Sequence, residues 1–384
     1  MTTLDKFPIS GQVDPGFEPV RAAFEKNFAK FGEVGAALYV TLDGKPVVDL
    51  WGGAANTSTM RPWRADTLVN VWSSTKGWLA LAMHILAERG LLDFEAPVAH
   101  YWPEFAQHGK NTVLVRHVLT HTSGLPAPSM KVPDEAVYEW TTMVHALEQS
   151  ELFWEPGTKC GYHAATFGWL NGEVLRRITG QSVGQFLRSQ VSGPLNADAF
   201  VGLSEQEQAR TAETVPPPWF GEWLFDKLLA LGGREGGMAF NNPPRPSAAA
   251  NTRRWQEAEI PSSNGHASAR GLARMYEPLA LGGKVGEVRL LSAANVERAR
   301  KEQIFQKDIV IGMPQKRSLG FMLSSGVNDP LPPTGLGHPG KGGSFGFADP
   351  AQRLAFGYVM NKMIIGIDTR AADLCRSVYA CLKP

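Results

Sequence analysis

A serine and a lysine three residues apart, Ser73 and Lys76, stand at the start of the apolar segment VNVWSSTKGWLALAMHILAERG, residues 69–90. Side chains at positions i and i+3 share one face of a helix, so the hydroxyl and the amine can come within hydrogen-bonding distance. An apolar setting disfavours the ammonium form and lowers the pKa of the lysine. The helix N-terminus adds to this effect and offers N–H groups to a developing oxyanion. The pattern predicts a serine nucleophile with a lysine as its base.

The same spacing has an ordinary structural explanation. Ser73 can cap the helix while Lys76 extends along its surface to solvent. A Ser-x-x-Lys motif alone does not separate the two interpretations, because one such spacing is expected by chance in a chain of 384 residues. The distinction therefore depends on other segments of the chain.

Tyr162 lies in such a segment, EPGTKCGYHAATFGWLNGEVLRRITG, where a Pro-Gly turn precedes a helix expected over residues 163–179. The tyrosine falls outside the apolar stripe of that helix. A tyrosine near a lysine can share a proton with it and pass the proton to a leaving group. The structural alternative is an amphipathic tyrosine at a seam between subdomains.

Another such segment, TGLGHPGKGGSFGFADP, is rich in glycine and leads into an expected strand, with His338 near its start as a candidate substrate contact. It contains a Gly-x-Ser-x-Gly pattern around Ser344, but no histidine follows that serine, as an α/β-hydrolase would require. Its sequence is also similar to a phosphate-binding loop, with Lys341 at the position of the lysine, but Gly342 stands where a Ser or Thr would bind Mg²⁺. Both of these assignments are disfavoured.

These segments together resemble the serine β-lactamase and penicillin-binding-protein superfamily, and specifically the class C-like carboxylesterases of family VIII. The motifs of this family appear in order as Ser73-x-x-Lys76, Tyr162-His163-Ala164 and His338-Pro339-Gly340. The phrases LVRHVLTHTSGLP, SNGHASARGLARMYEPLALGG and FGYVMNKM extend the likeness over roughly residues 15 to 380. The resemblance implies a β-lactamase/transpeptidase-like fold.

The resemblance also implies roles for individual residues. Ser73, Lys76 and Tyr162 would be catalytic, and the backbone N–H groups of Ser73 and Lys341 would form the oxyanion hole. His338 and Gly340 would contact substrate. Which of Lys76 and Tyr162 is the primary base stays open.

Departures from the antibiotic-hydrolase pattern favour ester substrates. In the antibiotic hydrolases the second motif usually ends in Asn, whereas this chain has Ala164, so the side-chain amide that would bind a substrate amide is missing. His338 replaces the lysine that would offer a permanent cation to a substrate carboxylate. We therefore expect a serine carboxylesterase that cleaves short- to medium-chain esters through an acyl-Ser73 intermediate, with a weak β-lactamase side activity. The alternatives are a β-lactamase or D-Ala-D-Ala peptidase, an acyltransferase to an alcohol, and a catalytically silent binding protein.

An aromatic segment, VPPPWFGEWLFDKLLALGG, is a candidate wall of the acyl pocket. Its candidate lining residues are Trp219, Phe220 and Trp223, for which ordinary core packing is the alternative. His117 and His121 have the spacing of a zinc helix but lack the adjacent glutamate and a third ligand cluster, so we expect a structural role. The sequence indicates no cofactor and no metal site.

Composition limits the partners. The chain is 43% hydrophobic with a formal net charge of +1, which indicates a globular protein without the basic surface that nucleic acid or an anionic membrane would require. Three cysteines without metal-ligand spacing and the absence of a visible signal peptide or long apolar run favour the cytoplasm. The expected partner is a small-molecule ester, and a homo-oligomer stays open.

The elements that must position these residues follow from periodicity and turn signals. Helices are expected at 16–31, 74–89, 163–179, 269–281 and 367–382. Asp43-Gly44 marks a hairpin, strands are expected in SLGFMLSS, GGSFGFADP and RLAFGYVMNKM, and NNPPRPSAAANTRRW is expected as a surface loop. The pattern indicates an α/β (α+β) fold. Residues 1–70 and 305–384 would share an antiparallel sheet flanked by helices, and residues 71–304 would form an inserted, mainly helical subdomain with a pocket flap near 214–245.

Overall fold

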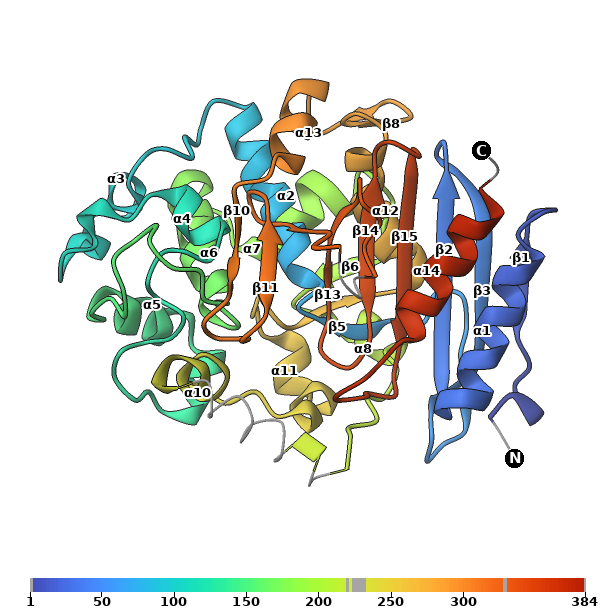
Figure 1. Cartoon of the computed structure of the whole chain (residues 1–384). Coiled ribbons are helices and arrows are strands. Elements are labelled where there is room, and N and C mark those ends of the chain that lie inside the picture. Colours follow the sequence, from blue (N-terminus) through green and yellow to red (C-terminus); the bar gives the residue numbers. More distant parts are fainter. Residues whose placement is uncertain (1–2, 219–220, 223–232, 327–329, 383–384) are drawn as a thin grey trace.

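A long antiparallel sheet dominates the computed structural model, which describes residues 3–218, 221–222, 233–326 and 330–382 (Figure 1). Its strand order is β1-β3-β2-β15-β14-β13-β12-β11-β10, and β4 pairs with β3 off this path. The strands are β1 (Ser10–Val13), β2 (Gly35–Leu42), β3 (Lys45–Asn56), β4 (Arg61–Pro62), β10 (Ile304–Lys307), β11 (Pro314–Arg317), β12 (Met322–Leu323), β13 (Leu336–Pro339), β14 (Phe345–Asp349) and β15 (Leu354–Met360). The sheet therefore joins the two ends of the chain, and the expected antiparallel sheet is confirmed.

The hairpin between β2 and β3 forms where the sequence predicts it. Asp43 and Gly44 both have positive φ, 51° and 73°, which is the backbone that a two-residue turn with right-handed strand twist requires. The turn closes on the pair Leu42 and Lys45. On its other side, β2 pairs with β15 from Ala36 to Leu42.

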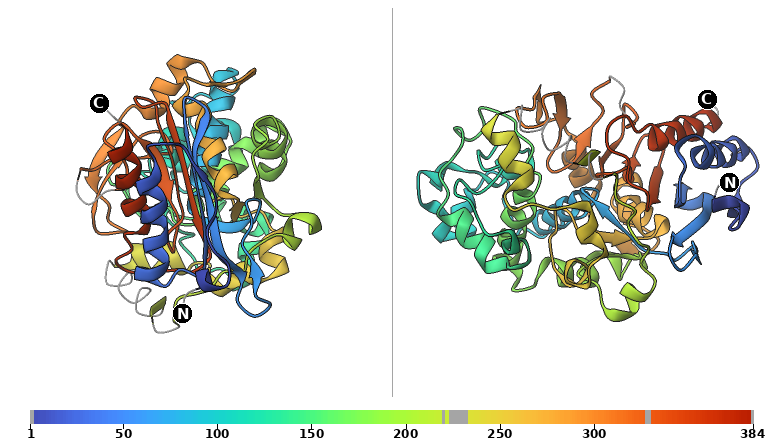
Figure 2. Two further views of the ribbon diagram at one scale, coloured as in Figure 1. Left: turned by 90° about the vertical axis from the view of Figure 1, so that its right-hand side faces the viewer. Right: turned by 90° about the horizontal axis from the view of Figure 1, so that it is seen from below.

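Helices cover both faces of the central strands, which explains why β15 is buried along its length. Helices α1 (Glu18–Phe31) and α14 (Arg370–Cys381) pack side by side on one face, as Figure 2 shows. Helix α12 (Ala269–Ala280) packs against β2, β14 and β15 from the other face, and the Ser268 hydroxyl caps it by accepting from the Gly271 N–H.

The other α-helices of the described residues lie between β5 and β10 in the chain and form the region beside the sheet (Figure 1). They are α2 (Thr75–Glu88), α3 (Val98–Tyr101), α4 (Val115–Leu119), α5 (Trp140–Glu148), α6 (Thr166–Thr179), α7 (Val183–Leu187), α8 (Glu205–Ala209), α10 (Arg234–Asn241), α11 (Arg253–Glu257) and α13 (Ala293–Arg300). Across the described ranges, we find no helix with the length and apolar character needed to cross a bilayer.

Two features of this region differ from the sequence-based expectations. A second, three-stranded sheet runs in the order β5 (Val69–Trp72), β7 (Gly265–Ala267) and β6 (Ala199–Val201). The tract 241–255 is not a simple surface loop, because it contains a 3₁₀ turn and the start of α11 and buries Trp255 completely. Its proline content suggested a loop, but two apolar residues that follow the prolines, Ala250 and Trp255, pack into the core.

Candidate active site

Ser73 lies at the turn between β5 and α2. Trp72, just before it, has a φ of 47°, a left-handed conformation that is costly for a bulky side chain and is often found at functional sites. Pairing with β7 is irregular at this point, and the indole packs 5.4 Å from the ring of Trp255. The strained residue turns the chain sharply from strand into helix and leaves Ser73 partly exposed at the junction.

Lys76 is completely buried one helical turn away. Its Nζ lies 3.1 Å from Ser73 Oγ, 2.9 Å from the Ala164 carbonyl oxygen and 2.8 Å from the Ser262 carbonyl oxygen. Burial lowers its pKa well below the usual value, and the cations of Arg245 and Arg317 add to the effect. The alternative in which this lysine extends to solvent is therefore wrong.

The contacts of Lys76 fit a neutral amine. A neutral amine has two N–H bonds, which the two carbonyl oxygens can accept, and one lone pair, which then faces the Ser73 hydroxyl. Within the described ranges, no carboxylate forms an ion pair with Lys76 that would restore its charge. The hydrogen-bond geometry of Lys76 and its lowered pKa therefore both indicate a neutral amine.

Tyr162 lies against this pair and is 7% exposed. Lys76 Nζ is 5.0 Å from the centroid of its ring, and the guanidinium carbon of Arg317 is 5.6 Å from it. Burial raises the pKa of Tyr162 to about 12, while a hydrogen bond with the Ser73 side chain and the charges of Arg317 and Arg245 oppose that rise. The structure thus brings together the serine, lysine and tyrosine of the sequence prediction.

The turn after β13 closes the other side of the site. Gly340 approaches its neighbours closely: a Cβ there would lie 2.3 Å from the Val71 carbonyl oxygen and 2.1 Å from Ser344 Oγ. Within the described part of the chain, the backbone N–H groups of Ser73 and Lys341 donate to no acceptor. Both are therefore available to a substrate oxygen, whereas the Lys341 ammonium is occupied by Glu222 at 2.5 Å.

His338 is buried at the end of β13, with its ring 6.0 Å from that of Tyr162. Its Nδ1 lies 2.7 Å from the Pro339 carbonyl oxygen and donates to it. Burial lowers the pKa of this imidazole to about 3. The third motif therefore presents a neutral ring where the antibiotic hydrolases carry a cation.

Several groups at the site escaped sequence reasoning. The carbonyl groups of Ala164 and Ser262 have no sequence signal, because any residue has a backbone carbonyl. Asp308 and Arg317 come from the distant β10–β11 segment, and only the fold brings them behind Tyr162. Trp219, Phe220 and Trp223, predicted to line an acyl pocket, lie outside the described residues.

The disfavoured patterns have structural explanations. Ser344 directly precedes β14, and its hydroxyl donates to the Val71 carbonyl oxygen at 2.8 Å, while its backbone carbonyl oxygen accepts the Gly340 N–H at 2.7 Å and holds the turn. His121 Nδ1 accepts the His163 N–H at 3.0 Å, and His117 Nδ1 accepts the Leu114 N–H. The described residues include no cluster of three or more side chains suited to a metal ion.

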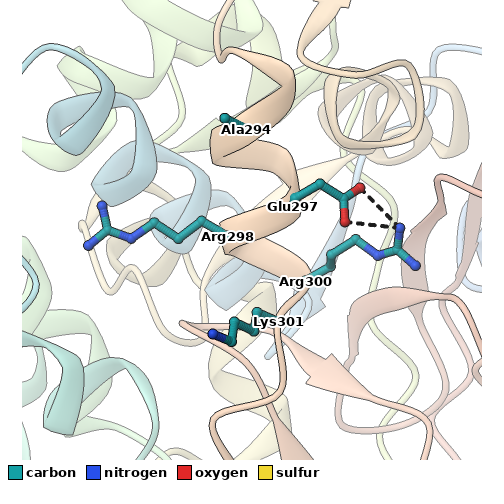
Figure 3. Close-up of a pocket in the computed structure, with 5 residues that line it drawn as sticks. All are labelled: Ala294, Glu297, Arg298, Arg300 and Lys301. Atoms are coloured by element: carbon teal, nitrogen blue, oxygen red, sulfur yellow. Dashed lines mark hydrogen bonds and ion pairs between the residues drawn. The ribbon is translucent and has the colours of Figure 1, made fainter.

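An open depression on α13 is also unrelated to this site (Figure 3). It is lined by Ala294, Glu297, Arg298, Arg300 and Lys301. Glu297 and Arg300 point toward one another and pair, while Arg298 points the opposite way. All five residues come from one helix and its C-cap, and none belongs to the serine site.

A serine, a buried lysine and a tyrosine, placed between a helical region and an antiparallel sheet, are the arrangement of a serine hydrolase with a β-lactamase-like fold. The model of the beta-lactamase family matches residues 23–378, and the chain belongs to this family.

Relatives with this architecture include esterases. The chain is 35% identical to the esterase/beta-lactamase LipL of Mycobacterium tuberculosis over 93% of its length and 83% of that protein. It is 41% identical to a family VIII carboxylesterase of known structure, with a TM-score of 0.91 over 97% of this chain and all of the other. It is 33% identical to a penicillin-binding protein homolog from Caulobacter crescentus, with a TM-score of 0.89 over 97% of this chain and all of the other.

Proposed function

We propose that this protein is a serine carboxylesterase that hydrolyses short- to medium-chain esters through an acyl-Ser73 intermediate. The observation that carries the proposal is the position of a buried Lys76 amine 3.1 Å from Ser73 Oγ, with its other two contacts on carbonyl oxygens. The amine is thereby directed at the proton that the nucleophile must lose. The esterases among the relatives support the reaction class.

Acylation begins when neutral Lys76 takes the Ser73 proton as Oγ attacks the ester carbonyl. The N–H groups of Ser73 and Lys341 receive the oxyanion, and each such donor contributes on the order of 3 kcal/mol to the stability of the transition state. The proton then passes through Tyr162 to the departing alkoxide. In the second half, water attacks the acyl-enzyme with the Lys76 and Tyr162 pair as its base, and Ser73 Oγ regains a proton.

Two features favour neutral esters over β-lactams and peptides. Ala164 contributes a carbonyl oxygen to Lys76, but its side chain offers no amide to a substrate. His338 is neutral, so the third motif supplies no cation for a substrate carboxylate. A weak β-lactamase side activity is consistent with the same acylation chemistry.

The test is hydrolysis of p-nitrophenyl esters of increasing acyl length, compared with nitrocefin on the same preparation. We expect the Ser73→Ala protein to fold and to lose ester hydrolysis by at least about a thousandfold. Retained turnover in that variant would remove Ser73 as the nucleophile. Preferred turnover of nitrocefin would favour the antibiotic-hydrolase alternative instead.

A further inference from the structure

A buried ion pair lies directly behind Tyr162. The side chains of Asp308 and Arg317 are 0% and 1% exposed, and Arg317 Nη2 lies 2.8 Å from Asp308 Oδ2. Arg317 Nη1 also donates to Cys160 Sγ at 2.9 Å. A buried pair of this kind gains little net stability, because desolvation of both charges offsets their attraction. Its position therefore calls for a role other than stabilising the fold.

Asp308 holds the backbone that carries Tyr162. Its Oδ1 accepts the N–H groups of Tyr162 at 3.0 Å, Val310 at 2.9 Å and Ile311 at 3.0 Å. The loop between β10 and β11 is thus fixed to the tyrosine segment, and the Ile309 N–H donates to the Cys160 carbonyl oxygen at 2.9 Å beside it. The carboxylate therefore accepts three backbone N–H donors and one guanidinium donor.

Arg317 places a positive charge against the tyrosine ring, with its guanidinium carbon 5.6 Å from the ring centroid. The titratable or charged groups that face Tyr162 are Lys76, His121, His163, Arg245, Asp308, Arg317 and His338. Burial keeps the three histidines neutral, because it lowers the pKa of each far below its usual range. Among the described residues, the charged groups that face the tyrosine besides Lys76 are therefore Arg245, Arg317 and Asp308.

We propose that Asp308 and Arg317 form the positioning pair of Tyr162, in which the carboxylate fixes the tyrosine backbone and the guanidinium holds a cation beside its ring. The inference rests on the proposed esterase function, in which Tyr162 and Lys76 exchange a proton with Ser73. Neither member of the pair contacts the reacting atoms. Both act through Tyr162 and Lys76.

The charge of Arg317 has a measurable consequence. A nearby cation favours phenolate and disfavours ammonium, so Arg317 lowers the pKa of both Tyr162 and Lys76. Removal of this charge should move the acid limb of the kcat/KM profile to higher pH, since that limb reports ionisation of the free enzyme's base. One unit charge at about the distance between Arg317 and the Tyr162 ring centroid, 5.6 Å, shifts the pKa of the tyrosine by about 2 units at an effective dielectric constant of about 20, and Asp308 offsets part of this shift.

Three variants separate charge from structure. Arg317→Lys keeps the cation, the double variant Asp308→Asn with Arg317→Met removes both charges without leaving one unpaired, and Arg317→Gln removes only the cation. We expect the pKa of the acid limb to stay within about 0.3 unit of the wild-type value in Arg317→Lys. It should rise by about 1 unit in the double variant, and by more than that in Arg317→Gln. We also expect kcat to fall in the double variant with KM for p-nitrophenyl butyrate changed by less than about threefold.

The experiment is the pH dependence of kcat/KM from pH 5 to 10, with circular dichroism and thermal unfolding as folding controls. An acid limb at the wild-type pH in the folded double or Gln variant would overturn the proposal. An equal shift in Arg317→Lys would also overturn it, because the charge would then not be the cause. Absence of Ser73-dependent ester hydrolysis in the wild type would instead refute the proposed function.

Discussion

Replacing Gly340 with alanine tests the geometry of the oxyanion hole. The new Cβ would lie 2.1 Å from Ser344 Oγ and 2.3 Å from the Val71 carbonyl oxygen, whereas nonbonded atoms attract only near 3.5 Å. Ser344 is 1% exposed and bonded to that carbonyl, so it has little room to yield. The turn must therefore retreat by about 1 Å and take the Lys341 N–H with it.

A displacement of this size removes one oxyanion donor, because a hydrogen bond lengthened from about 2.9 Å to about 3.9 Å is lost. Loss of one donor lowers kcat by roughly 10²- to 10³-fold, or about 3–4 kcal/mol. The assay is the steady-state hydrolysis of p-nitrophenyl butyrate. The matched control is Ser344→Ala, which removes the Oγ atom that the new Cβ would contact and adds no atom to the turn. We expect that control to retain kcat within about fivefold.

The double variant Gly340→Ala with Ser344→Ala sharpens the test. It relieves the contact with Oγ but keeps the contact with the Val71 carbonyl oxygen, so we expect it to stay impaired. A folded Gly340→Ala protein with wild-type kcat would refute the reasoning, since the turn would then tolerate a side chain without moving the donor.

Three other perturbations have predicted outcomes. Tyr162→Phe should lower kcat for ester hydrolysis by about 10²- to 10⁴-fold with little change in KM, because it removes the proton relay and keeps the ring; an unchanged kcat would exclude the relay. Burial lowers the pKa of His84 to about 4, so the unfolded chain binds a proton below pH 6.5 that the folded chain does not, and the stability present above pH 6.5 is lost as the pH falls toward 4. Urea unfolding should therefore show that His84→Gln reduces the loss of stability between pH 7.5 and 5.5 by about 1.4 kcal/mol, and an identical pH dependence in both proteins would contradict this assignment. Arg370→Met should lower the free energy of unfolding by about 3–5 kcal/mol, because it leaves the Glu33 carboxylate buried without the guanidinium 2.7 Å away; the double variant with Glu33→Gln should recover most of this loss.

Local patterns predicted much of the fold and the centre of the site. Asp43-Gly44 predicted a hairpin because both residues adopt positive φ readily. Ser73 and Lys76 could be paired from the sequence because residues three apart at the start of a helix lie on the same face. The resemblance to family VIII carboxylesterases connected these residues to Tyr162 and His338, which are distant in the sequence.

The rest could not be predicted because it depends on long-range packing. In the second sheet β7 pairs with β5, which lies about 195 residues earlier in the chain, and with β6, which lies about 65 residues earlier, and no local periodicity indicates these pairings. Arg317 has no sequence signal that marks it out, and its burial follows from the fold of the β10–β11 segment over Tyr162. Trp255 likewise lies in a tract whose prolines suggested a loop.

The central claim is that Ser73 is acylated because a neutral Lys76 accepts its proton. The most direct measurement is the rate of covalent labelling by a fluorophosphonate from pH 5 to 10, with the labelled residue identified by peptide mass spectrometry. The account predicts one label on Ser73, whose rate rises with pH to a plateau below the ordinary lysine pKa of about 10.4 and falls by about 10²-fold or more in Lys76→Met. Labelling of Ser344, or labelling of Ser73 at the same rate in Lys76→Met, would contradict it.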